Sequence, residues 1–111
     1  MDLPLQITLR GLDRSDALEA AVRSRADKLQ RFYRHIGSCR VVIERPERHH
    51  RHGRQFIVRL DIKVPGGEIA INREHDEDAL LAVHDAFDAA RRRLQDHARM
   101  QRGDVKPHSQ A

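Results

Sequence analysis

Apolar and polar residues alternate in four short stretches of the chain, and each alternation predicts a strand with one buried face. The first stretch lies at residues 3–9, the second at 39–45 and the third at 56–64. The fourth follows the turn sequence Pro65-Gly66-Gly67 and ends near Arg73. A sheet built from such strands needs a cover over its apolar face.

Two longer segments repeat their apolar residues at helical spacing, and each predicts an amphipathic helix. The first helix is expected to begin after a cap at Asp13 or Ser15, and the second after a cap at Asp76 or Asp78. The second is expected to end near Arg99. The first apolar stripe contains Leu18, Val22, Ala26, Leu29, Phe32 and Tyr33. The second stripe contains Leu80, Val83, Phe87, Ala90 and Leu94.

The order of these elements, β-α-β-β-β-α, predicts an α+β fold. We expect a two-layer sandwich in which both helices pack on one face of a four-stranded sheet and the other face is exposed to solvent. The last three strands are expected to form an antiparallel meander. A chain of 111 residues suits one domain. We place this domain at residues 1–100 and expect a flexible tail at 101–111, which has no apolar pattern.

The excess of basic residues indicates which kinds of partner the chain can bind. The chain has 21 Lys and Arg against 17 Asp and Glu, a net charge of +4 and a pI of about 10.0, which favours polyanionic partners. Its one cysteine, Cys39, cannot form an intramolecular disulfide, so nothing requires an oxidising compartment. The N-terminal stretch MDLPLQITLRG is not expected to be a secretory signal, and no apolar run approaches the ~18 residues of a membrane span. We therefore expect a cytoplasmic protein without a membrane partner.

Basic residues are concentrated on the two predicted helices. If the helices lie side by side on one sheet face, their solvent sides form one surface, and these residues form a basic strip that can meet RNA phosphates. The alternative is a pair of ordinary solvated faces offset by nearby acids. The triplet Arg91-Arg92-Arg93 favours the strip, because three neighbours cannot share one acidic partner on a helix. The candidates are Arg23, Arg25, Lys28, Arg31, Arg34, Arg91, Arg92, Arg93 and Arg99.

The run Arg48-His49-His50-Arg51-His52 forms a polar segment between two predicted strands. Three histidines in four residues suggest zinc or nickel, but the flanking arginines oppose a cation and no second ligand pair stands at metal spacing. Contact with RNA and a simple solvated hairpin tip remain as alternatives. We expect no metal site here.

Catalytic chemistry finds little support in the sequence. Acids and imidazoles gather near the start of the second helix, where acids already serve as caps and dipole partners. They are His75, Asp76, Glu77, Asp78 and His84. No phosphate-binding glycine loop is present, and Cys39 fits its strand pattern. The three phenylalanines and the tyrosine fit the core stripes, so a base-stacking platform is not expected. We predict no enzyme, no cofactor and no small-molecule substrate.

Several motifs together resemble a known family. They are the helix at 15–33 with its Ala26-Asp27-Lys28-Leu29, the strand-turn-strand at 64–74, and the acidic entry Asp76-Glu77-Asp78 before a long helix. In order and spacing the chain is similar to the ribosome hibernation-promoting factor and ribosome-associated translation inhibitor family, also described as sigma-54 modulation proteins. The resemblance covers residues 3–99 and is to the short form of the family.

The resemblance implies a protein that binds the small ribosomal subunit in the channel for messenger and transfer RNA, inhibits translation and preserves idle ribosomes under stress. It implies contacts between basic helix residues and ribosomal RNA phosphates. These roles pass first to Lys28, Arg31, Arg91, Arg92 and Arg93, and then to Arg23, Arg25 and Arg99. The alternative is a regulatory protein-interaction module that binds a protein partner through the solvent-exposed sheet face or the tail. The oligomeric state is left open.

Overall fold

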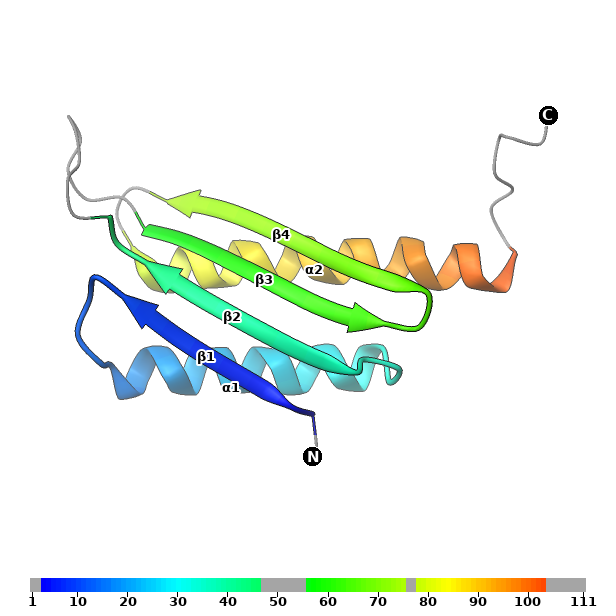
Figure 1. The fold of residues 1–111 in the computed structure, drawn as a ribbon, viewed down its shortest axis with the longest axis horizontal. Helices are drawn as coiled ribbons and strands as arrows, with labels where there is room; N and C mark the ends of the chain where they lie inside the picture. Colours follow the sequence, from blue (N-terminus) through cyan, green and yellow to red (C-terminus); the bar gives the residue numbers. More distant parts are fainter. Residues whose placement is uncertain (1–2, 47–55, 76–77, 104–111) are drawn as a thin grey trace.

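The computed structural model describes residues 3–46, 56–75 and 78–103, and it confirms the predicted order of elements (Figure 1). The elements are β1 Leu5–Arg10, α1 Asp16–Phe32, β2 Ser38–Glu44, β3 Phe56–Val64, β4 Gly67–His75 and α2 Ala79–Arg102.

The four strands form one sheet in the order β1-β2-β3-β4. β1 is parallel to β2, and β2, β3 and β4 form an antiparallel meander. The register places Val41 of β2, Leu60 of β3 and Ile71 of β4 side by side in one row across the sheet. Both helices cover the same face of the sheet, with α1 beside β1 and α2 across β3 and β4 (Figure 1). The predicted two-layer α+β sandwich is confirmed.

The core lies between this sheet face and the helices. Alternate residues of β3, Val58, Leu60 and Ile62, are fully buried, as period-two strands require. From α1 the core receives the predicted residues Leu18, Val22, Ala26 and Leu29. From α2 it receives Ala82, Val83, Ala86, Phe87, Ala89, Ala90 and Leu94. Leu80 was predicted to be in the core but is 46% exposed, because the buried face of α2 begins only at Ala82 and Val83.

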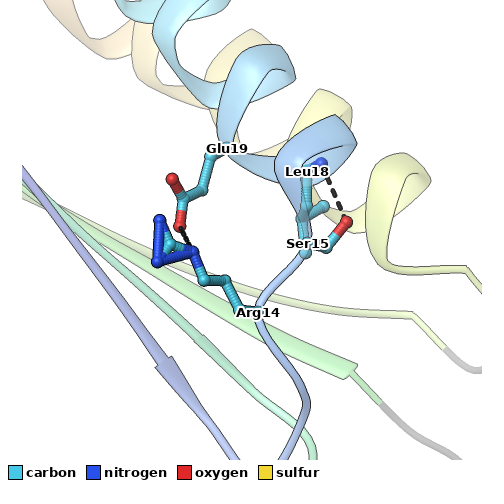
Figure 2. Close-up of polar contacts among 4 residues, drawn as sticks. All are labelled: Arg14, Ser15, Leu18 and Glu19. Carbon is cyan, nitrogen blue, oxygen red and sulfur yellow. Dashed lines mark hydrogen bonds and ion pairs between the residues drawn. The ribbon is translucent and has the colours of Figure 1, made fainter.

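Ser15 caps α1, which decides between the two predicted caps. Its hydroxyl oxygen accepts a hydrogen bond from the backbone N–H of Leu18 at 3.1 Å, and the guanidinium of Arg14 lies 3.6 Å from the carboxylate of Glu19 (Figure 2). At the second helix, Asp78 accepts a hydrogen bond from the backbone N–H of Leu80 at 2.9 Å. Each helix thus starts at a side chain that satisfies one of its free amides.

The C-terminal end of α2 extends beyond the predicted limit. The helix continues to Arg102, and Gly103 ends it in the left-handed conformation with its N–H donating to Met100 O. Residues 101 and 102 are therefore helical, although we expected the tail to begin at 101. The remainder of that predicted tail, 104–111, lies outside the described residues.

The tight turn between β3 and β4 contacts this end of α2. Val64 pairs with Gly67, and Gly66 has a φ of +86°, as a type II turn requires at its third position. The carbonyl oxygen of Pro65 lies 3.0 Å from Nε2 of His97. This contact links the C-terminal half of α2 to the β3–β4 turn.

Candidate nucleic-acid interface

α1 and α2 run in the same direction along the sheet. Because β1 and β4 are parallel through the register of the sheet, and each helix follows one of them back across the same face, both helices point the same way. Figure 1 shows both with their C-terminal ends at the side of the β3–β4 turn. The C-terminal halves of the two helices therefore lie at one end of the molecule.

Charge is unevenly distributed between the two ends. Residues 23–34 and 91–102 contain ten Lys and Arg but only two Asp, whereas residues 13–22 and 78–90 contain six Asp and Glu but only one Arg. Cations near a helix C-terminus are favoured by the helix dipole, which explains part of this bias. The parallel arrangement then brings two such segments together. We call residues 23–34 and 91–102 the basic end.

A groove lies between the two helices where the basic end begins. Arg25, Lys28 and Arg91 line it, together with one acid, Asp88. That acid lies 3.3 Å from Nε2 of His84. The guanidinium of Arg91 stacks over the ring of Phe32, 4.5 Å from its centroid, which holds the arginine in place without neutralising it. The groove is therefore lined by three cations that come from two helices.

Two of the predicted site residues face outward from this groove. Arg23 lines a hollow at the β1 edge with Leu3 and Leu5. Arg93 lies about 200° further round the helix than Arg91, so it faces away from α1. The structure thus separates these two residues from the groove, and the predicted strip is narrower than the sequence suggested.

The other predicted helix residues are exposed. Arg92 is about 200° from both Ala90 and Leu94, which are buried, so it points away from the sheet into solvent. Arg31 is exposed, and its guanidinium lies 2.9 Å from the carboxylate of Asp27. Arg99 lines a second hollow at the ends of the helices. Of the nine predicted helix cations, only Arg31 has an ion-pair partner among the described residues.

The second hollow has a volume of about 630 Å³ and lies where both helices end. Phe32, Tyr33, Arg34 and His35 line it from the first helix and the residues after it, and Gln95, Ala98, Arg99, Gln101 and Arg102 line it from α2. Phe32 and Tyr33 were predicted to lie in the core. This is wrong for Phe32, which is 39% exposed, and only partly right for Tyr33, which is half-buried. A signal existed: Phe32 is seven residues after Arg25 and four after Lys28, so it shares their face.

The open face of the sheet carries both signs of charge. Its residues include Arg40, Arg59 and Lys63 but also Glu44 and Asp61. Glu44 and Arg59 form an ion pair at 3.5 Å. A face of this kind has no single sign, so it suits a polyanion less well than the basic end does.

The other predicted RNA contacts belong to the segment between β2 and β3. Arg48, His49, His50, Arg51 and His52 lie outside the described residues. Within residues 3–46, 56–75 and 78–103, no group of three His, Cys, Asp or Glu side chains is arranged to hold a metal ion. Over the same residues, no helix is long and apolar enough to span a membrane.

Cys39 is expected to resist thiol reagents in the folded protein. Burial, and secondarily the negative charge of Asp61, raise the pKa of its thiol from 9.0 to about 12. At pH 8 the thiolate fraction is then roughly a thousandfold lower than for an exposed thiol. Ellman's reagent should react slowly with the native protein and fast in guanidinium chloride. Fast reaction without denaturant would contradict the buried position.

Comparisons with known proteins agree with the fold. The family model described as Sigma 54 modulation protein / S30EA ribosomal protein matches residues 5–102. A solved structure titled as a ribosomal subunit interface protein from Coxiella burnetii is 21% identical, with a TM-score of 0.74, over 86% of this chain and 98% of that one. The N-terminal domain of Protein Y from Thermus thermophilus is 18% identical, with a TM-score of 0.70, over 87% and 99%. The search of curated proteins gave no match.

Proposed function

The chain belongs to the Sigma 54 modulation protein / S30EA ribosomal protein family, and from this premise we propose that it binds the small ribosomal subunit through its basic end. The basic end meets ribosomal RNA phosphates in the channel for messenger and transfer RNA. Occupying that channel blocks translation and stabilises idle ribosomes. The protein then acts in the cytoplasm, where ribosomes are, and needs no cofactor.

The parallel placement of two basic helix ends is the observation that supports this proposal most. Arg25 and Lys28 from α1 and Arg91 from α2 line one groove, and within the described residues none of them has an acidic partner in an ion pair. Guanidinium groups donate in a planar fork that matches phosphate oxygens, and arginine is the main cation here. Cations on both sides of a groove can contact successive phosphates of an RNA backbone.

The proposed roles of the residues follow from their positions. Arg25, Lys28, Arg91 and Arg99 are the principal phosphate contacts, because they line the groove or the hollow that follows it. Arg31 and Arg92 contribute from the exposed surfaces beside the groove. Arg23 and Arg93 contribute least, because they face outward on opposite flanks. Arg48, His49, His50, Arg51 and His52 are proposed as additional RNA contacts.

Sedimentation with purified ribosomal subunits tests this function. We expect the protein to sediment with the small subunit at low salt and to dissociate as salt rises. Four phosphate contacts would lower the association constant by roughly a hundredfold between 50 and 200 mM salt. A protein that stays at the top of the gradient at low salt would refute the proposal. Binding to one protein in a nuclease-treated, ribosome-free extract would instead support a protein-interaction module.

A further inference from the structure

We propose that the hollow at the ends of the helices receives one unpaired base of the bound RNA, a step that rests on the proposed function and extends it. We call this site the base hollow, and define it as the 630 Å³ hollow between Phe32–His35 and residues 95–102. The base stacks against the aromatic rings of the hollow, and its phosphate lies beside Arg34 and Arg99.

The size and lining of the base hollow fit a nucleotide. Sites for small ligands commonly have volumes of about 300–1,000 Å³, with apolar walls and a few polar groups. Phe32 and Tyr33 supply ring surface, and every base has a π-face that can stack on such rings. The amides of Gln95 and Gln101 each offer donors and an acceptor, which suits the edge of a base.

The rings are held in place before any ligand arrives. Tyr33 makes T-shaped contacts with His35 and His97, with ring centroids 5.6 Å and 6.3 Å apart. His97 is itself fixed by its hydrogen bond to the Pro65 carbonyl oxygen. Phe32 is held by the stacked guanidinium of Arg91. Pre-positioned rings lower the ordering cost of binding, so the site favours a flat, rigid ligand.

The charge around the base hollow selects a nucleic acid over a neutral aromatic ligand. Neither Arg34 nor Arg99 has an ion-pair partner among the described residues, so both are available to a phosphate. Phe32 also lines the groove between the helices, so the groove and the base hollow adjoin. An RNA strand whose backbone follows the groove reaches the hollow with its next base.

Binding of two matched oligomers to the full chain tests the inference. The probes are a single-stranded ten-nucleotide oligoadenylate RNA and an abasic ribose-phosphate oligomer of the same length and charge. We expect the wild-type protein to bind the abasic oligomer about tenfold more weakly, since one stacked base is lost. Phe32→Leu keeps an apolar side chain but removes the ring, and it should abolish most of this tenfold preference. Tyr33→Leu provides a second, independent test if Phe32→Leu disturbs folding.

A matched control is provided by a second ring–arginine pair. The guanidinium of Arg45 lies 5.9 Å from the centroid of Phe56, at the start of β3 and outside the base hollow. Phe56→Leu should therefore leave the tenfold preference unchanged. An equal loss in this variant would overturn the assignment to the hollow, since it would show that any lost ring has the same effect.

The outcomes separate this inference from the proposed function. Equal binding of both oligomers by the wild-type protein overturns the base hollow, while sedimentation with ribosomes still supports the proposed function. A preserved base preference without ribosome binding overturns the proposed function and leaves the hollow as a site for single-stranded RNA. Failure to bind either oligomer at low salt overturns the base hollow and weakens the groove assignment together.

Discussion

Replacing Arg25 and Arg91 together by glutamate is expected to weaken binding to the small ribosomal subunit by about a hundredfold or more. Hydrogen bonds to charged groups contribute about 1.5–3 kcal/mol each, and this double variant removes two and adds repulsion from phosphates. Both side chains line the groove between α1 and α2. The measurement is the dissociation constant for labelled protein and purified subunits at fixed salt. Thermal unfolding of the variant checks that the fold survives.

The matched control for this double variant is Arg23→Glu with Arg93→Glu. It changes the net charge by the same amount, but Arg23 faces the β1 edge and Arg93 faces away from α1. At physiological salt, screening limits the range of electrostatic interactions between exposed charges to about 8 Å. Substitution of these outward-facing residues should therefore change the dissociation constant less than about fivefold. Equal losses in the two double variants would show that net charge, and not the groove, controls binding.

Gly11→Ala is expected to lower the free energy of unfolding by about 3 kcal/mol. Gly11 has a φ of +77°, a conformation that costs L-residues about 1–2 kcal/mol, and an added Cβ would collide with the backbone carbonyl oxygen of Arg45. That carbonyl cannot move freely, because the N–H of Arg45 donates to Arg10 O at 2.9 Å. A clash of this kind adds about 1–3 kcal/mol. Urea unfolding followed by circular dichroism gives the value.

Gly103→Ala separates the two causes of that loss. Gly103 has a similar φ of +82°, but no atom lies within 4 Å of an added Cβ. The expected loss is therefore only the conformational part, about 1 kcal/mol. Equal losses for the two variants would mean that the close approach of Gly11 to Arg45 does not constrain the fold.

The fold could be predicted because its periodicities are strong and local. In β3, Val58, Leu60 and Ile62 alternate with Arg59 and Asp61, and only a half-buried strand suits that pattern. The helix ends were less certain, since Asp13 and Ser15 are equally good caps in sequence and only the geometry selects Ser15. The end of α2 was missed because residues 100–102 carry no apolar stripe, while a glycine cap at Gly103 fixes the helix limit.

The candidate site was only partly predictable, because it depends on how two distant helices face each other. Periodicity shows that Arg91, Arg92 and Arg93 point in three directions, but not which direction meets α1. Phe32 was assigned to the core because an aromatic residue at the end of an apolar stripe usually lies there. In the structure the core face of α1 ends with Leu29, and Phe32 contacts Arg91 across the groove.

Density for this protein bound to its own small ribosomal subunit tests the central claim most directly. The groove between α1 and α2 should face ribosomal RNA, with Arg25, Lys28 and Arg91 within hydrogen-bond distance of phosphate oxygens and the open sheet face turned away. Density in which the sheet face meets the RNA, or in which these three side chains point into solvent, would contradict the account.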